Sequence, residues 1–192
     1  MNNFILASAS PRRRELLGEL GITPRVCPTD ADETIEEKVA PSRFVEILSK
    51  RKADAYTGDI GEDDILIASD TVVALGDIIL GKPADRQDAF DMLKSLSGKA
   101  HSVFTGITVK SKEKSVTTHD ETKVYFREMG DDEIWAYVDS GDPMDKAGSY
   151  GIQGEAGKFV SAIEGSLNNV IGLPTELLKE ILTKDFNIGD LK

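Results

Sequence analysis

Apolar and polar residues along the first part of the chain predict a strand that leads directly into a helix. The apolar run at residues 4–8 is typical of a short buried strand. Ser10 is a favoured N-cap residue and Pro11 suits the first helical position, so a helix is expected to begin here. Apolar residues at helical spacing follow and end at Gly21, which predicts where the helix stops.

The rest of the chain alternates between further helical and extended patterns. The expected helices cover residues 40–56, 85–98, 131–141 and 173–186, and Asp85 is expected to cap the second of them. The expected strands cover residues 64–75, 78–83, 101–111, 123–128 and 158–165, and a Gly76-Asp77 turn joins the first two into a hairpin. The glycine-rich segment 145–157 is expected to be a loop. This alternation predicts an α/β fold, with no repeat or low-complexity linker to mark a domain boundary.

Length, composition and charge narrow the classes of function. The 192 residues, 40% of them hydrophobic, suit one domain or a two-lobed unit with a real core. A formal net charge of −11 opposes binding to nucleic acid or to an anionic membrane, so an anion site must be local. Cys27 is the only cysteine, which excludes an intrachain disulfide and leaves a Cys/His zinc site poorly supplied. Without a basic leader or an apolar run of roughly 18 residues, we expect a soluble cytoplasmic protein.

Three consecutive arginines, Arg12 to Arg14, stand at the start of the first predicted helix. Cations are disfavoured there by about 0.3–1 kcal/mol each at low salt, because the helix N-terminus is itself positive. The arginines are either a solvated surface or part of an anion site. In the anion site, backbone N–H groups of the turn and the hydroxyls of Ser8 and Ser10 would join them in binding a polyphosphate. The turn has no glycine, so it is neither a Walker A loop nor a dinucleotide fingerprint.

Two carboxylates and two lysines are further candidates for chemistry. Asp70 follows an apolar run, where it can cap a turn at a strand end, or ligate a divalent cation and activate water. Glu33 belongs to an acidic stretch that is either a solvated charge run or the source of a second carboxylate. Lys52 and Lys82 are either exposed charges or contributors to the positive field that phosphoryl chemistry needs.

Glycines occur at every third position from Gly148 to Gly157. The pattern suits a flexible loop. It also suits a loop that closes over a planar ligand, with the Gln153 amide as both donor and acceptor to a base edge.

Six segments of the chain, taken together, resemble the Maf family of nucleoside triphosphate pyrophosphatases: LASASPRRRELL, ASDTVV, GKP, LSGKAHSVFTG, DPMDKAGSYGIQGEAG and NNVIGLP. The resemblance runs from about residue 5 to about residue 182. It implies an inosine triphosphatase-like fold, in which a long, twisted, mixed sheet is flanked by helices. The whole chain, residues 1–192, would be a single Maf-like domain with two lobes around a cleft.

The resemblance also implies the activity and the residues that perform it. The reaction would be hydrolysis of a nucleoside triphosphate to the monophosphate and pyrophosphate with a divalent cation, Mg²⁺ or Mn²⁺. The residues that resemble the family's substrate-binding positions are Ser8, Arg12, Arg13, Lys52, Lys82, Thr71 and Gln153. Asp70 and Glu33 match its catalytic and metal-binding acidic positions, with Asp70 as the favoured general base. Thr71 and Gln153 resemble the branch that acts on dTTP and UTP, in a house-cleaning role on canonical or modified pyrimidine nucleotides.

A second function stays open at this point, because Maf proteins have also been associated with inhibition of septum formation. The chain would then be a non-enzymatic binding partner of the cell-division machinery. DNA binding through the arginine-rich helix is opposed by the net charge of −11 and by the lack of a second basic helix. The expected partner is therefore a nucleotide rather than nucleic acid or a membrane, and a homodimer is left open.

Overall fold

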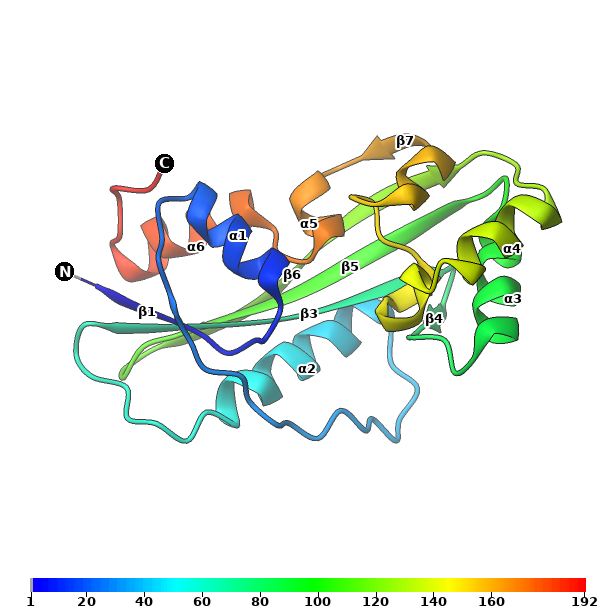
Figure 1. Cartoon of the computed structure of the whole chain (residues 1–192). Helices are drawn as coiled ribbons and strands as arrows, with labels where there is room; N and C mark the ends of the chain where they lie inside the picture. Colours follow the sequence, from blue (N-terminus) through cyan, green and yellow to red (C-terminus); the bar gives the residue numbers. More distant parts are fainter. Residues whose placement is uncertain (1) are drawn as a thin grey trace. The chain divides into compact units, whose positions relative to one another are not determined.

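The computed structural model describes residues 2–192 and contains a mixed β-sheet with helices packed against it (Figure 1). Its strands are β1 Asn3–Leu6, β2 Arg25–Val26, β3 Asp64–Leu75, β4 Ile78–Leu80, β5 Ala100–Lys110, β6 Ser115–Phe126 and β7 Val160–Glu164. The strand order is β2-β1-β3-β5-β6-β7, and β4 pairs with β3. Strand β1 is parallel to β2 and β3, whereas β4 and β7 are antiparallel to their neighbours. The predicted α/β class with a mixed sheet flanked by helices is confirmed.

The chain divides into two compact units, each of which is described by itself. Unit 1 comprises Met1–Asp70, Thr105–Asp120 and Gly172–Lys192, and unit 2 comprises Thr71–Phe104 and Glu121–Ile171. The helices of unit 1 are α1 Pro11–Glu19, α2 Pro41–Asp54 and α6 Thr175–Phe186. Those of unit 2 are α3 Arg86–Leu96, α4 Asp131–Asp139, α5 Leu167–Ile171 and the 3-10 helices η1 Asp142–Asp145, η2 Ala147–Ser149 and η3 Glu155–Phe159. The predicted arrangement of two lobes around a cleft stays a prediction.

In unit 1, helix α2 covers one face of the sheet and helices α1 and α6 cover the other (Figure 1). Ile5 of β1 and Leu66 of β3 are buried together with Ala53 of α2. Parallel strands with helices on both faces are buried on both faces, which is why these strands are nearly continuous apolar runs instead of alternating ones.

Helix α2 and strand β5 approach each other closely at Gly106. A Cβ atom at this position would lie 2.1 Å from the carbonyl oxygen of Val45, so only glycine permits the contact. Nearby, the hydroxyl of Ser49 hydrogen-bonds that of Thr108 over 3.1 Å, and Thr108 in turn bonds Thr117 over 2.9 Å. These contacts hold α2, which carries the predicted site lysine, firmly on the sheet.

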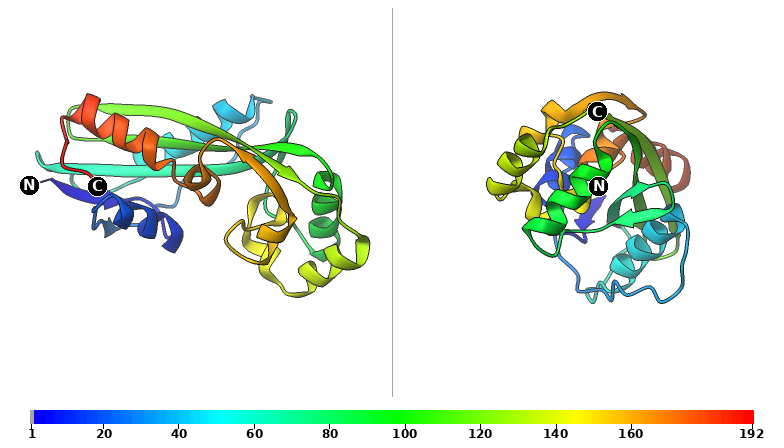
Figure 2. Two further views of the ribbon diagram at one scale, coloured as in Figure 1. Left: turned by 90° about the horizontal axis from the view of Figure 1, so that it is seen from above. Right: turned by 90° about the vertical axis from the view of Figure 1, so that its right-hand side faces the viewer.

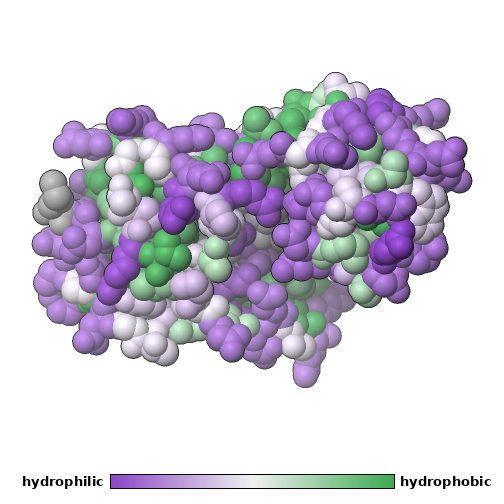
Figure 3. Space-filling model, viewed as in Figure 1, coloured by the Kyte–Doolittle hydropathy of each residue, from purple (hydrophilic) through white to green (hydrophobic). Residues whose placement is uncertain are grey.

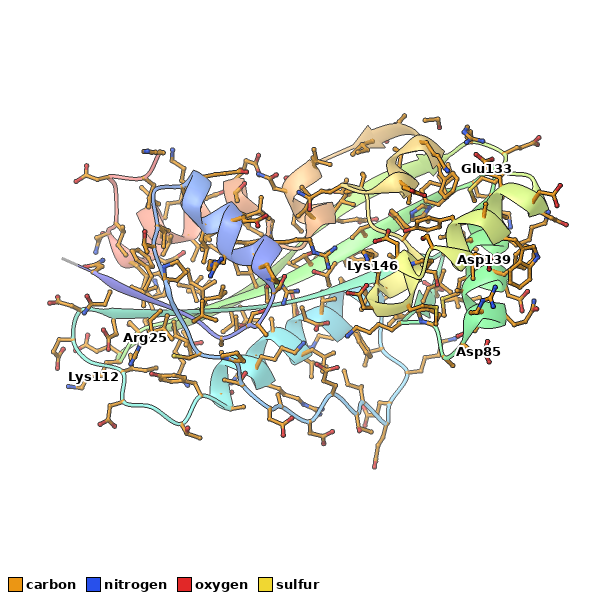
Figure 4. All side chains as sticks on the ribbon, in the orientation of Figure 1. Arg25, Asp85, Lys112, Glu133, Asp139 and Lys146 are labelled. Atoms are coloured by element: carbon orange, nitrogen blue, oxygen red, sulfur yellow. The ribbon has the colours of Figure 1, made fainter. Side chains whose placement is uncertain are left out.

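In unit 2, helices α3 and α4 pack side by side (Figures 1 and 2). The rings of Phe90 and Trp135 stack between them with centroids 4.5 Å apart. Asp85 caps α3 as predicted, because its side chain accepts the backbone N–H of Asp88 over 2.9 Å (Figure 4). Gly98 follows the helix with a φ of +67°, which confirms the predicted end.

Three local features differ from the predictions. Strand β6 begins at Ser115 instead of residue 123. Residues 115–122 are polar and show no clear alternation of apolar and polar positions, but pairing with β5 holds them in an extended conformation. The segment 145–157 is mostly short 3-10 helices rather than a flexible loop, and residues 148–151 are buried. Helix α5 was not predicted, since five residues are too few for a helical pattern to stand out.

Hydrophilic residues predominate on the face of the molecule in Figure 3, with small apolar groups between them. Within residues 2–192, none of the helices combines the length and the apolar character that crossing a membrane requires.

Candidate functional site

The arginine-rich turn in unit 1 is organised around the Arg13 side chain. Ser10 caps α1, its hydroxyl accepting the backbone N–H of Arg13 over 3.5 Å. The guanidinium donates from Nη1 to the hydroxyl of Ser8 over 3.1 Å and from Nε to the carbonyl of Gly172 over 2.9 Å. Arg13 therefore joins the turn after β1 to the segment before α6 and is held in one orientation.

Arg13 is half-buried, and its guanidinium lies among other charged groups. Burial lowers the pKa of its guanidinium, and the charge of Arg12 lowers it further, whereas the carboxylates of Asp70 and Glu33 raise it. An arginine keeps its proton under such perturbation. Arg12 is half-buried at the same helix start and Arg14 is exposed. The turn thus presents a fixed positive charge, as an anion site requires.

Lys52 of α2 brings the two candidate carboxylates together. Its Nζ lies 2.5 Å from Oδ1 of Asp70 and 2.8 Å from Oε1 of Glu33. Asp70 is only 8% exposed, and a buried carboxylate without a partner would be costly, so this ammonium compensates its charge. The interpretation of Asp70 as a turn cap is wrong, because β3 continues through it to Leu75.

Glu33 lies in residues 28–40, which form no helix or strand, and the end of α2 holds this segment. The Thr29 hydroxyl donates to the carbonyl of Lys52 over 2.9 Å. Nη1 of Arg51 donates to the carbonyls of Asp32 and Thr34, over 3.0 and 2.6 Å. Sequence reasoning missed Arg51, for which its place beside Lys52 was the available signal.

Gly172 was also missed as a site residue. Its carbonyl accepts hydrogen bonds from Nε of Arg13 over 2.9 Å and from the hydroxyl of Ser69 over 3.3 Å. Its φ of +130° is one that glycine adopts and other residues rarely do. The glycine of the NNVIGLP segment was the sequence signal, although nothing in it names the hydrogen-bond partners.

The other three candidate residues belong to unit 2. Thr71 is half-buried in β3, while Lys82 and Gln153 are exposed. The backbone N–H of Gly148 donates to the carbonyl of Gly81 over 3.0 Å, so the GKP turn and the glycine-rich segment are joined. The approach of these side chains to those of unit 1 stays a prediction.

The glycine-rich segment is also anchored within unit 2. Nζ of Lys146, labelled in Figure 4, contacts Asp142 and Asp145 over 3.0 and 2.8 Å. Tyr150 is buried, and its hydroxyl bonds Nε2 of His101 over 2.8 Å. Burial lowers the pKa of His101 to about 4, so this imidazole is neutral near pH 7. A neutral histidine packed edge-on against the rings of Phe126 and Tyr150 is a packing residue.

The two carboxylates are compatible with a divalent cation that shares its coordination with phosphate. Across residues 2–192, no cluster of three or more His, Cys, Asp or Glu side chains could hold a metal ion by itself. Asp70 and Glu33 nevertheless direct one oxygen each at a single cationic group. Mg²⁺ is commonly held by one or two carboxylates together with substrate phosphates. The donor set therefore fits such an ion.

The sequence of this chain is similar to those of known proteins. The family model described as Maf-like protein matches residues 3–185. A protein of Pelotomaculum thermopropionicum named dTTP/UTP pyrophosphatase is 44% identical over 96% of this chain and 97% of its own length. Proteins of the same name from Thermoanaerobacter sp. and Bdellovibrio bacteriovorus are 46% and 44% identical, covering 96% and 94% of this chain and 97% of their own lengths.

Proposed function

Because the chain belongs to the Maf family, as its motifs predicted, we propose that it is a pyrophosphatase that hydrolyses dTTP and UTP. The products would be the nucleoside monophosphate and pyrophosphate. The observation that carries the proposal is the pairing of Asp70 and Glu33 on Lys52 in the same unit as the fixed guanidinium of Arg13. The names of near full-length relatives support the choice of dTTP and UTP.

In this proposal the arginine-rich turn binds the triphosphate. Arg13 is already held by Ser8 and Gly172, so little side-chain entropy is lost when phosphate binds. Arg12 and the positive end of the α1 helix dipole add positive charge at the same place. The bound anion offsets the unfavourable placement of arginines at a helix N-terminus. We further propose that Thr71, Lys82 and Gln153 of unit 2 bind the nucleotide, with Gln153 reading the base.

Asp70 and Glu33 would hold Mg²⁺ or Mn²⁺, which supplies electrophilic activation and charge neutralisation for phosphoryl transfer. Asp70 orients the attacking water and accepts its proton. Lys52 keeps the two carboxylates directed at one place and compensates their charge when the site is empty of substrate. Arg12 and Arg13 stabilise the negative charge that develops on the departing pyrophosphate.

The test is pyrophosphate release from dTTP and UTP with Mg²⁺ and Mn²⁺. Asp70→Asn should lower kcat by about 10²–10⁴-fold with little change in KM, because it removes the general base and keeps the shape. Asp59→Asn, at an exposed position, is the matched control and should leave kcat unchanged. Near-wild-type turnover by Asp70→Asn would contradict the role of Asp70 as base.

A second variant tests the triphosphate clamp. Arg13→Ala should lower kcat/KM for triphosphates, since both binding and turnover depend on the guanidinium. An unchanged kcat/KM would contradict that role.

The alternative function, a non-enzymatic partner of the division machinery in the cytoplasm, is not favoured by the names of the relatives. Failure to release pyrophosphate from any nucleoside triphosphate with either metal would favour it instead.

A further inference from the structure

We propose that Arg51 is a positioning residue for Glu33, an inference that rests on the proposed function of the site. Nη1 of Arg51 donates to the backbone carbonyls of Asp32 and Thr34, the residues on either side of Glu33. The next residue of α2, Lys52, binds the Glu33 carboxylate over 2.8 Å. Adjacent residues of one helix therefore hold the two residues that flank Glu33, by their carbonyls, and Glu33 itself, by its carboxylate.

The segment around Glu33 is attached to helix α2 at several points. Residues 28–40 form no helix or strand, and the Glu33 side chain is 61% exposed, so packing restrains it weakly. A local turn, in which the Asp32 carboxylate accepts the Thr34 N–H over 2.9 Å, shapes the peptide without attaching it to the rest of unit 1. Attachment comes from α2, through Arg51, through Lys52 and through the Thr29 hydroxyl bond to the Lys52 carbonyl.

Helix α2 is a suitable frame for this purpose because it is itself fixed. Gly106 lets its backbone approach β5, and Ser49 bonds Thr108 across the same contact. A carboxylate that binds a metal or orients water must be held close to its productive geometry by residues that do not themselves react. Arg51 supplies that support through bonds to backbone carbonyls, so its effect on catalysis should pass entirely through Glu33.

Arg51→Ala measures the effect, with Arg43→Ala as the matched control. Arg43 is a 64% exposed arginine of the same helix that pairs with Glu46 over 3.1 Å. Loss of a supporting partner of a metal ligand typically costs about 10–100-fold in metal affinity or activity. We expect Arg51→Ala to lower kcat/KM for dTTP and the affinity for Mn²⁺ by about 10–100-fold each. Mn²⁺ binding is measured by electron paramagnetic resonance. Arg43→Ala should leave both unchanged.

A double-mutant cycle separates positioning from a direct role. If Arg51 acts through Glu33, adding Arg51→Ala to Glu33→Gln should cause no further loss in kcat/KM. Arg51→Lys should recover part of the activity, because its ammonium can still reach a carbonyl. Losses that multiply in the double variant, or unchanged Mn²⁺ affinity and kcat/KM in Arg51→Ala, would overturn the proposal.

Hydrogen exchange of residues 28–40 provides a readout that does not depend on turnover. In Arg51→Ala these amides should exchange faster, whereas those of β1 and β3 should not change. Equal exchange in the wild-type and variant proteins would overturn the proposed hold on the segment. If the wild-type protein releases no pyrophosphate, while Arg51→Ala still exchanges faster than the wild type in residues 28–40, the proposed function alone is refuted.

Discussion

Replacing Lys52 with methionine tests the central ion pair, because it removes the shared ammonium and keeps an extended side chain. Glu33 can turn towards water, since its side chain is 61% exposed, but the Asp70 side chain is only 11% exposed. Removing one partner of a buried ion pair costs about 3–5 kcal/mol, because the remaining charge is uncompensated. The Lys52 side chain is 17% exposed, so we expect a loss at the lower end of this range, about 3 kcal/mol in the free energy of unfolding.

The loss is measured by urea unfolding followed by far-ultraviolet circular dichroism at pH 7. For a chain of this size about 3 kcal/mol corresponds to a decrease in Tm of about 6–12 °C. Adding Asp70→Asn to Lys52→Met should recover most of the loss, because the uncompensated carboxylate is then replaced by a neutral amide. Lys50→Met, which removes an exposed lysine paired with Asp54 on the same helix, should cost less than about 1 kcal/mol. A comparably small loss in Lys52→Met, or no recovery with Asp70→Asn, would refute the reasoning.

Three further predictions concern glycines and the buried histidine. Gly106→Ala should lower the free energy of unfolding in urea by about 3 kcal/mol or more, because its Cβ would lie 2.1 Å from a backbone oxygen. Gly18→Ala has open space around its Cβ and should be neutral or stabilise α1 by up to about 1 kcal/mol. Gly172→Ala should cost about 1–3 kcal/mol and lower kcat/KM, because alanine disfavours a φ of +130° and the carbonyl that holds Arg13 would shift. Burial lowers the pKa of His101 from 6.5 to about 4, so the unfolded chain takes up the proton first as the pH falls. The contribution of the neutral His101 to the free energy of unfolding is therefore complete above about pH 6.5 and falls by about 3 kcal/mol towards pH 4. His101→Phe should reduce this slope.

Each of these expectations has a contrary outcome. Equal urea midpoints for Gly106→Ala and Gly18→Ala would show that α2 can move away from β5 without cost. A Gly172→Ala protein with normal kcat/KM would show that its carbonyl does not place Arg13. The same pH slope in wild-type and His101→Phe proteins would assign the acid sensitivity to other groups.

Features governed by near neighbours could be predicted from the sequence. The N-caps Ser10 and Asp85 and the glycine ends at Gly21 and Gly98 depend on bonds within one turn of helix, and all four lie where expected. The Gly76 hairpin is equally local, since β3 and β4 pair directly across it. The helical stretches and buried strands follow from periodicity, which is why the α/β class was predictable.

Features that depend on distant contacts could not be derived in this way. The start of β6 is decided by the neighbouring strand, and the partly buried 3-10 helices of residues 142–159 by packing around Tyr150 and Phe159. For the site, the motifs named the charged residues but not their partners. Arg51 and Gly172 escaped notice because their contacts involve backbone carbonyls, which any residue type provides.

The sequence by itself determined which charges the protein carries and in which local elements they lie, because capping, periodicity and turn preferences act over a few residues. Only the tertiary structure decided how those charges are paired. Lys52 meets Asp70 across 18 residues and Arg13 meets Gly172 across 159. Such contacts form when buried apolar faces bring distant segments together, and a buried charge then requires a partner from whichever segment lies beside it. In this protein that requirement pairs Asp70 with Lys52 and directs the Arg13 guanidinium to the carbonyl of Gly172.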